Sequence, residues 1–465
     1  MKHSTATLPD REQRLAKALR SNLRRRKQSI SSDERIEEAG EGNDILSVKG
    51  GTRLVGEIPI SGAKNAALPL LVASLLTDEE MRFDNIPRVS DVRILLELLN
   101  MLGCCSENID GTWKLQAKNI TQTTAPYEIV SKMRAGFWVI APLLARCGEA
   151  CVSLPGGCAI GARPVNLYIK ALEAMGADIS LEEGYIRANA QNGLSGAHIH
   201  LPFVSVGATH VVAMAASLAK GRTVLENAAR EPEVVTLLEC LKKMGANIKG
   251  VGTSRITIEG VGGLLHGTGH TVPPDRIEAG TYAIAVAITG GEAVLRGIGI
   301  DMLESLRDIL VAAGVDVTEN AEGLLVARRT PRCSAVSIET APYPGFPTDL
   351  QAQFMAMMCL ADGNTTITET IFENRFMHVP ELIRMGANIN LRRDKAVVHG
   401  VPELAGASVK ATDLRASVCL VLAGLAAQGE TRVRHIHHLD RGFENLEDKL
   451  SACGANIQRL KETPA

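Results

Sequence analysis

The chain has 465 residues, of which 45% are hydrophobic, 22% are charged and only 3% are aromatic, and its formal net charge is −2. This length predicts two domains, and the near-neutral charge provides no general attraction to nucleic acid or to a membrane surface. Ten cysteines without regular pairing favour reduced thiols over a disulfide scaffold or a zinc site. Because the sequence has no long apolar run and no signal-peptide core, we expect a cytoplasmic protein without a membrane span.

The first 44 residues differ in composition from the rest of the chain. Met1 to Lys27 carries nine basic residues against two acids, and Asp33 to Asp44 carries six acids against one arginine. A basic block followed by an acidic block is typical of a solvated arm. The alternative is an arm that contacts an anionic partner or the body of the protein.

From Ile45 onward, a helix that ends in a glycine turn and is followed by a strand recurs six times. The turns are spaced 73, 69, 69, 72 and 68 residues apart. Their glycines are Gly103, Gly176, Gly245, Gly314, Gly386 and Gly454. Glycine at this place is typical of a helix C-terminus. The period predicts six α/β units of about 70 residues, and two groups of three would match the expected two domains.

Each unit also has an alanine-rich helix that is apolar on nearly all sides. These helices are predicted at 66–76, 137–145, 211–219, 282–289, 355–361 and 417–427. A helix of this composition belongs inside a domain, where small side chains allow close packing. All six segments are too short to span a membrane.

Polar residues precede or open these buried helices, among them Lys64, Arg134 and Arg415. A helix N-terminus attracts anions through its free N–H groups and its dipole, so added cations would make phosphate or carboxylate sites. Ordinary capping is the alternative, and it is at least as good an explanation for Ser205 and Thr348.

Arginines recur at similar places after the short strands of several units. These are Arg163, Arg230, Arg375 and Arg441. Arginines at equivalent points of repeated units predict a shared anion-binding rim, because the guanidinium fork binds carboxylate and phosphate through two hydrogen bonds. Asp349 follows a proline-rich approach that would hold its carboxylate in place, as a general base requires, although it could instead cap its helix.

Cys158 lies in a glycine-rich loop, SLPGGCAIGARP at 153–164, directly before a predicted helix at 165–176. The nearby Arg163 favours the thiolate, so this cysteine could be reactive. A buried structural cysteine is the alternative. From the glycines at 156–161 we also expect this part of the loop to close over a bound ligand.

Eight ordered segments of this chain resemble the family of UDP-N-acetylglucosamine 1-carboxyvinyltransferases, from about Ile45 to Leu460. They are SGAKNAALPLL at 61–71, LPGGCAIGARPVNL at 154–167, SVGATH at 205–210, ENAAREPE at 226–233, FPTDLQAQF at 346–354, ENRFMHVPEL at 373–382, TDLRAS at 412–417 and DRGFENLEDKL at 440–450. The resemblance implies a two-domain inside-out α/β barrel of six repeats, with helices inside and sheets outside. It places one lobe at 64–273 and the other at 45–63 plus 274–465, and it gives no counterpart for residues 1–44.

The family moves the enolpyruvyl group of phosphoenolpyruvate (PEP) to the 3-hydroxyl of UDP-N-acetylglucosamine (UDP-GlcNAc), by addition and elimination, in the first committed step of peptidoglycan synthesis. The resemblance implies no metal and no cofactor. It makes Cys158 the general acid, with a possible covalent PEP adduct, Asp349 the base, and Asp413 a neighbour of the chemistry. The implied PEP residues are Lys64, Asn65, Arg163, Arg415 and Arg441. The implied UDP-GlcNAc residues are Arg134, Arg163, Pro164, Val165, Asn166, Leu167, Ser205, Val206, Gly207, Asp349 and Ile371.

Three positions depart from the family pattern. Phe203, Asn166 and Tyr168 stand where many members have lysine, aspartate and histidine, which predicts altered contacts at the uridine end. Two other functions compete with this one. The first is the related enzyme with a shikimate acceptor, which the cysteine loop disfavours; the second is a sensor without catalysis, which Lys64, Cys158, Asp349 and Arg441 together disfavour. The oligomeric state is left open.

Overall fold

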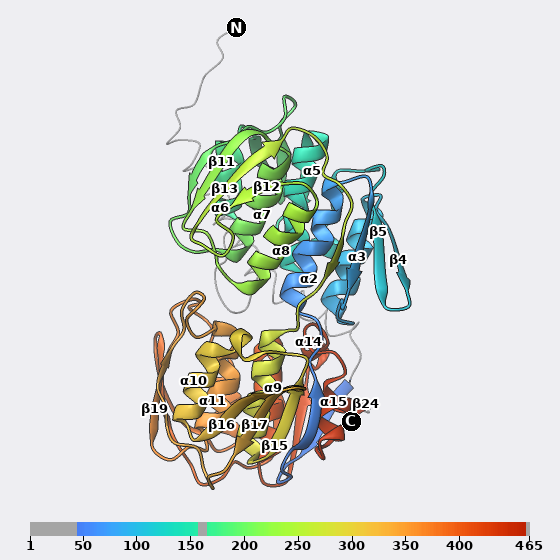
Figure 1. The fold of residues 1–465 in the computed structure, drawn as a ribbon. Coiled ribbons are helices and arrows are strands. Elements are labelled where there is room, and N and C mark those ends of the chain that lie inside the picture. Colours follow the sequence, from blue (N-terminus) through green and yellow to red (C-terminus); the bar gives the residue numbers. More distant parts are fainter. Residues whose placement is uncertain (1–43, 157–164, 462–465) are drawn as a thin grey trace.

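The computed structural model describes residues 44–156 and 165–461, which form two lobes joined at one side (Figure 1). The buried apolar side chains fall into two separate clusters. One cluster runs from residue 63 to 272, and the other joins 46–58 to 277–457. Each lobe therefore has its own hydrophobic core, and residues 46–58 contribute to the second one.

Each lobe consists of three units, and each unit has one four-stranded sheet with the same strand order. A short edge strand runs parallel to the second strand, an outer helix follows, and an antiparallel hairpin completes the sheet. The first unit of lobe 1 consists of β14 (Gly269–Thr271), β3 (Glu80–Asp84), α3 (Ser90–Met101), β4 (Cys105–Ile109) and β5 (Thr112–Gln116). The second consists of β6 (Thr124–Ala125), β7 (Glu149–Ser153), α6 (Asn166–Ala174), β8 (Asp178–Glu182) and β9 (Tyr185–Asn189). The third consists of β10 (His198–His200), β11 (Lys220–Glu226), α8 (Pro232–Lys243), β12 (Asn247–Lys249) and β13 (Arg255–Val261).

Lobe 2 repeats this plan, except that its last sheet has no hairpin and is completed by residues 44–49, from the other end of the described chain. Its first unit consists of β2 (Val55–Pro59), β15 (Glu292–Arg296), α10 (Glu304–Ala312), β16 (Val315–Asn320) and β17 (Gly323–Arg328). The second consists of β18 (Ile338–Glu339), β19 (Asn364–Thr368), α12 (Val379–Arg384), β20 (Asn388–Arg392) and β21 (Lys395–His399). The third consists of β22 (Ser408–Lys410), β23 (Glu430–Arg434), α15 (Leu446–Ala452), β24 (Asn456–Lys461) and β1 (Asp44–Lys49). The predicted six-fold repeat is confirmed. The described strands form six separate open sheets, so the inside-out arrangement does not contain a closed barrel.

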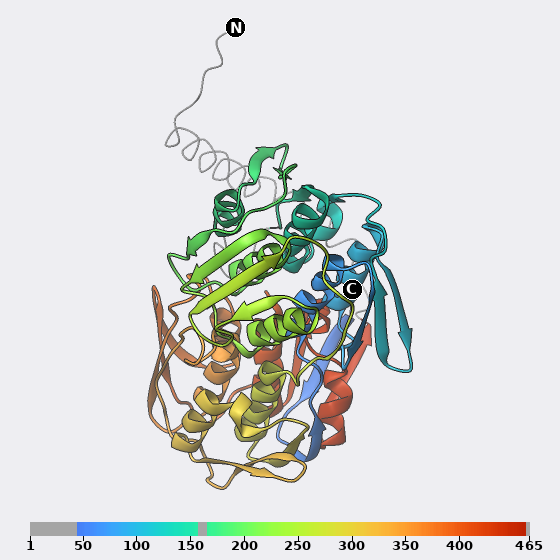
Figure 2. The ribbon, with the colours of Figure 1, turned by 45° about the horizontal axis from the view of Figure 1, so that its top comes forward.

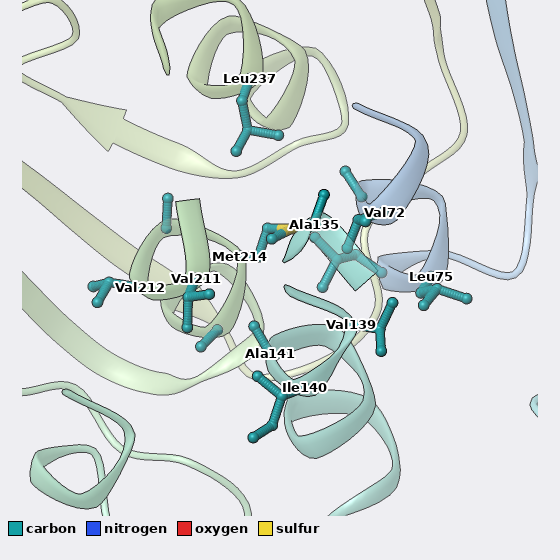
Figure 3. Packing of buried hydrophobic residues seen from close by; sticks show 14 of the residues in the cluster. Val72, Leu75, Ala135, Val139, Ile140, Ala141, Val211, Val212, Met214 and Leu237 are labelled. Atoms are coloured by element: carbon teal, nitrogen blue, oxygen red, sulfur yellow. The ribbon is translucent and has the colours of Figure 1, made fainter. Parts of the chain in front are cut away.

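Six helical segments occupy the interior of the lobes, as their composition predicts. They are α2 (Lys64–Ala73), η2 with α5 (Arg134–Val139, Ile140–Cys147), α7 (Val206–Leu218), α9 (Arg276–Thr289), η4 with α11 (Thr348–Leu350, Gln351–Met358) and α13 (Leu414–Ala426). In α7, every residue from Ala208 to Leu218 is buried. Figure 3 shows side chains of α2, η2, α5, α7 and α8 meeting in the lobe 1 core. Small residues let these helices approach one another closely.

The repeated glycines end the outer helices, as predicted. All six have φ between 85° and 102°, a conformation that glycine adopts without the strain of a Cβ atom. At Gly103 a Cβ atom would also lie 2.4 Å from the carbonyl oxygen of Asn119. These positions therefore require glycine, and the next strand starts one or two residues later.

The two lobes are linked by two crossing segments that lie side by side (Figures 1 and 2). An antiparallel bridge joins Gly62 to Pro274. The backbone N–H of Ala63 donates to the Pro273 carbonyl at 2.8 Å, and the N–H of Asp275 donates to the Ser61 carbonyl at 2.8 Å. The first crossing segment, which ends at Ala63, is followed directly by α2, and the second, which ends at Asp275, is followed directly by α9. Among the described residues, no helix has the length and apolar character needed to cross a bilayer.

Candidate active site

Most of the predicted site residues lie at the starts of the buried helices. Lys64 and Asn65 open α2, Arg134 opens η2, and Ser205 precedes α7. In lobe 2, Asp349 lies within η4, while Asp413 precedes α13 and Arg415 is its second residue. Each position combines a polar side chain with a helix N-terminus, where free N–H groups favour anions.

A buried carboxylate connects two predicted PEP residues across the lobes. Asp91, in the first turn of α3, accepts a hydrogen bond from Lys64 Nζ at 3.1 Å and another from Arg441 Nε at 2.9 Å. Lys64 and Asp91 belong to lobe 1, and Arg441 belongs to lobe 2, at the end of α14 (His437–Asp440). The structure thus brings Lys64 and Arg441 onto a single anionic group.

The charges around Lys64 oppose one another. Burial lowers the pKa of Lys64, and so do the Arg415 and Arg441 guanidinium groups, whereas the Asp91 carboxylate raises it. Burial would raise the pKa of Asp91, but Lys64 and Arg441 outweigh burial and hold it below its usual range. Arg415 is therefore close enough to Lys64 to affect its charge, which places three predicted PEP residues in one electrostatic group.

Asp349 is clamped by two buried arginines. Its Oδ1 accepts from Arg375 Nη2 at 2.7 Å, and its Oδ2 accepts from Arg415 Nη2 at 2.9 Å. Burial would raise the pKa of Asp349, but the two guanidinium groups hold it well below its usual range. The carboxylate is consequently ionised near neutral pH, and its side chain does not serve as the cap of this helix.

Two of the other predicted helix starts carry side-chain caps, those at Asp413 and Ser205. Asp413 accepts from the N–H groups of Arg415 and Ala416, at 2.8 and 3.1 Å. Ser205 accepts from the Ala208 N–H at 3.3 Å, so the capping alternative holds for this residue. Thr348 instead donates its hydroxyl to Glu369 Oε2 at 2.9 Å.

Glu369 holds the predicted nucleotide-sugar residue Ile371 beside the start of η4. Its Oε1 accepts from the N–H groups of Ile371 and Phe372, at 2.9 and 3.1 Å. Its Oε2 accepts from Thr348, which precedes Asp349 in the chain. The turn that contains Ile371 is thereby fixed next to the Asp349 clamp.

On the lobe 1 side, the start of α7 packs against α6. A Cβ atom at Gly207 would lie 2.3 Å from Tyr168 Oη and 3.1 Å from Trp138 Nε1. Among the described residues, Asn166 Oδ1 is buried without a hydrogen-bond partner. Val165 and Leu167 are buried beside it, and Phe203 is 54% exposed. The three departures from the family pattern therefore have different surroundings, which range from buried to exposed.

Some predictions fall elsewhere. Cys158, Arg163 and Pro164 lie outside the described residues, and so do residues 157–161 of the loop at 156–161 that is expected to close. Arg230 takes no part in the ion pairs that Arg375 and Arg441 form with Asp349 and Asp91. It is exposed, and its Nε donates to the Gly252 carbonyl at 3.2 Å, in its own lobe.

Two further buried ion pairs flank the crossing segments. Arg276, the first residue of α9, binds Glu233 of α8 through two hydrogen bonds of 3.0 and 3.3 Å, and this pair joins the lobes. Lys449 Nζ donates to Glu278 at 2.7 Å and to Ser61 Oγ at 2.6 Å. Burial raises the pKa of Glu278 to about 7, against the effect of Lys449.

A pocket of about 1510 Å³ lies on the outer side of the Asp91 bridge, between α3 and the segment 440–459. Its lining includes Ser90 and Asp440, the neighbours of Asp91 and Arg441, together with Trp113 and Phe443. The lining does not contain Lys64 or any of the aspartates and arginines of the clamp. The described residues also contain no group of three or more His, Cys, Asp or Glu side chains placed to hold a metal ion.

The most informative residue absent from the predicted site is Asp91. Its sequence context, Ser90-Asp91 before an amphipathic helix, is that of an ordinary helix start. Arg375 was expected at an anion-binding rim, but its pairing with Asp349 could not be read from the sequence. Glu369 could not be identified from the sequence, because two of its partners, Thr340 and Thr348, lie 29 and 21 positions away.

Comparisons with known proteins show the family of this chain. Residues 48–450 match the family EPSP synthase (3-phosphoshikimate 1-carboxyvinyltransferase). Two relatives named UDP-N-acetylglucosamine 1-carboxyvinyltransferase, from Chelativorans sp. (strain BNC1) and Rhodopseudomonas palustris (strain TIE-1), are 57% and 58% identical over 427 residues. Each match covers 90% of this chain and 99% of the relative.

Solved structures show the same fold. The enolpyruvyl transferase NikO from Streptomyces tendae is 26% identical, with a TM-score of 0.83, over 91% of this chain and 100% of that one. An EPSP synthase from Acinetobacter baumannii has a TM-score of 0.71 at 20% identity, over 90% of this chain and 100% of that one, which supports the fold alone.

Proposed function

Because the chain belongs to the EPSP synthase family of carboxyvinyl transferases, we propose that it transfers the enolpyruvyl group of PEP to the 3-hydroxyl of UDP-GlcNAc and releases phosphate. The observation that carries this proposal is the identity of 57–58% over nine tenths of the chain to relatives named for this activity. In this proposal the protein acts in the cytoplasm, at the first committed step of peptidoglycan synthesis.

Lys64 and Asn65 contact PEP, and Arg163, Arg415 and Arg441 hold its anionic groups or those of the intermediate. The support from the structure is the convergence of Lys64 Nζ and Arg441 Nε on one carboxylate, at 3.1 and 2.9 Å. An array that already holds one anion between two lobes has the charge and spacing suited to a second one. Charge-assisted hydrogen bonds of this kind are among the strongest in proteins.

The reaction proceeds by addition and elimination. The sugar hydroxyl oxygen bonds to C2 of PEP, its proton passes to Asp349, and C3 takes a proton from the Cys158 thiol. Elimination then expels phosphate from C2 and returns a proton from C3 to the Cys158 thiolate, which restores the double bond in the product and the thiol. The proton on Asp349 leaves with the phosphate. Cys158 also forms a covalent adduct with PEP, and the reaction needs no metal and no cofactor.

The role of Asp349 requires a change in its surroundings. A carboxylate held by Arg375 and Arg415 has a pKa well below its usual range, which makes it a weak base. Arg415 is also a proposed PEP ligand, so a bound anion competes with Asp349 for the same guanidinium group. Losing this partner raises the basicity of Asp349 when the substrate arrives.

UDP-GlcNAc binds along lobe 1 and reaches Asp349 across the lobes. Its proposed contacts are Arg134, Arg163, Pro164, Val165, Asn166, Leu167, Ser205, Val206, Gly207, Asp349 and Ile371. The starts of η2, α6 and α7 support this arrangement, because their N–H groups suit the diphosphate.

The test is phosphate release by the purified full chain, with PEP and either UDP-GlcNAc or 3-phosphoshikimate as acceptor. Release with UDP-GlcNAc alone supports the proposal, and release with 3-phosphoshikimate alone overturns it. Binding of UDP-GlcNAc without turnover would indicate a sensor that has lost catalysis.

In the same assay Cys158→Ser should be inactive and should lose covalent labelling by fosfomycin, a phosphonate epoxide, as measured by mass spectrometry. Unchanged labelling of the variant would identify another thiol as the reactive one.

A further inference from the structure

Asp91 occupies a position that no proposed step of the reaction uses. Its side chain is 4% exposed, and both of its oxygens are engaged, Oδ2 with Lys64 and Oδ1 with Arg441. Burying a carboxylate is costly unless it is paired and hydrogen-bonded, so this placement requires both cations. A residue with two proposed PEP ligands as its partners affects both of them at once.

We propose that Asp91 is a positioning residue, which holds Lys64 of one lobe and Arg441 of the other at the PEP site and keeps the Lys64 side chain charged. This inference rests on the proposed function, since it assigns Asp91 a role in binding PEP. Asp91 itself does not touch the reacting atoms in this scheme.

The geometry links Asp91 to the relative position of the lobes. Lys64 is the first residue of α2, and its backbone N–H donates to Asp275 Oδ2 at 3.1 Å, at the crossing between the lobes. Arg441 follows α14 in lobe 2. The Asp91 carboxylate therefore spans from the crossing segment to the facing lobe, and any movement of lobe 2 must stretch or break the Arg441 contact.

The charge balance explains why a carboxylate is needed here. The charged groups that face the Lys64 ammonium are Asp91 from α3, Arg415 from α13 and Arg441 from the end of α14, and Asp275 faces its backbone N–H. Asp91 is the one anion among the three side chains that act on the ammonium. Without it, burial and two guanidinium groups would all favour neutral Lys64, which cannot attract PEP as strongly.

The test compares Asp91→Asn with wild type in steady-state assays from pH 6 to pH 9. Asparagine keeps the size and a hydrogen-bonding oxygen but removes the charge. We expect the KM for PEP to rise about tenfold or more, because a charge-assisted contact is lost. The rise should grow with pH, because Lys64 loses its proton at lower pH in the variant. The KM for UDP-GlcNAc should change much less.

Two further variants separate positioning from stability. Asp91→Glu keeps the charge and should restore the wild-type pH profile, even if kcat falls. Glu233→Gln removes another buried carboxylate that joins the lobes, but this one pairs with Arg276 and does not face Lys64. Its pH profile for PEP should match that of wild type.

The outcomes are distinct. A rise in the KM for PEP that is the same at every pH in Asp91→Asn, or an equal rise in that KM in Asp91→Glu, would show that Asp91 is only structural. If Asp91→Asn does not fold, Asp91→Glu decides the question, and a profile displaced to lower pH in that variant overturns the proposal. If wild type itself does not turn over PEP with UDP-GlcNAc, the proposed function fails instead.

Discussion

Glu278 provides a quantitative test of the electrostatics at the crossing between the lobes. This residue of α9 is 2% exposed, and it accepts hydrogen bonds from Lys449 Nζ at 2.7 Å and from the Ser61 N–H at 2.6 Å. Burial raises its pKa from 4.5 to about 7, although Lys449 opposes this shift. The folded chain therefore binds the Glu278 proton more tightly than the unfolded chain does.

The sign and size of the effect follow from linkage. The stability that Glu278 contributes through its proton is complete below pH 4.5 and is lost as pH rises through about 7. A difference of about 2.5 pKa units, at 1.36 kcal/mol each, corresponds to about 3 kcal/mol. Glu278→Gln carries no such titration. The free energy of unfolding of the variant, relative to wild type, should therefore increase by about 2.5 kcal/mol between pH 5 and pH 8, since part of the loss already occurs below pH 5.

The measurement is equilibrium urea unfolding of both proteins, followed by circular dichroism at pH 5, 6, 7 and 8. If the two lobes unfold separately, the transition of lobe 2 is compared. Lys449→Met is the matched control, because loss of the ammonium should move the wild-type pH dependence to higher pH. A variant-minus-wild-type difference that stays constant with pH would refute the reasoning, and a difference of opposite sign would show that Lys449 outweighs burial.

Three other variants test the interior of the lobes and the site. Burial lowers the pKa of His210 to about 3, so wild type should lose about 2 kcal/mol of stability between pH 6.5 and pH 5, and His210→Leu should not show this loss in urea midpoints. Asp349→Asn leaves two buried guanidinium groups without their carboxylate, so thermal and urea unfolding should show a loss of about 3–5 kcal/mol, together with loss of turnover; wild-type stability would contradict the clamp. Gly207→Ala should cost about 1–3 kcal/mol because its Cβ meets Tyr168 Oη, and adding Tyr168→Phe should recover part of that cost in thermal unfolding.

The repeat architecture could be predicted because it requires a particular residue type at single positions. Gly245 and Gly386, for example, have φ of 101° and 96°, which other residues rarely adopt, so glycine recurs at each helix end. The buried helices were likewise visible from composition, since α7 and α13 have few charged residues to place in solvent. Local requirements of this kind can be read in order along the chain.

The ion pairs could not be predicted, because they depend on contacts between distant segments. Asp91 and Arg441 are separated by 350 positions, and nothing near either residue identifies the other. Arg230 and Arg375 have similar places in their units, yet Arg230 is exposed and Arg375 is buried against Asp349. Equivalent places in a repeat therefore predict the backbone position, but the surrounding lobe determines which charge a side chain meets.

The prediction for the site has a mixed outcome for the same reason. Helix starts such as Lys64 and Asp413 could be located from the sequence, and the structure places them at buried N-termini. The low pKa of Asp349 could not be foreseen, because it arises from Arg375, 26 positions away, and from Arg415, 66 positions away in the next unit. Which atoms of a substrate these residues touch remains a prediction, which the assays above test.

The path of the chain through lobe 2 also sets the order in which the lobes are completed during synthesis. Lobe 1 is one continuous stretch, whereas β1 forms hydrogen-bonded ladders with β23 and β24, close to the other end of the described chain. A ribosome therefore releases everything that lobe 1 needs long before it has made the partners of β1. We expect that a nascent chain completes lobe 1 first, and that β1 stays an unpaired strand until β23 and β24 have emerged.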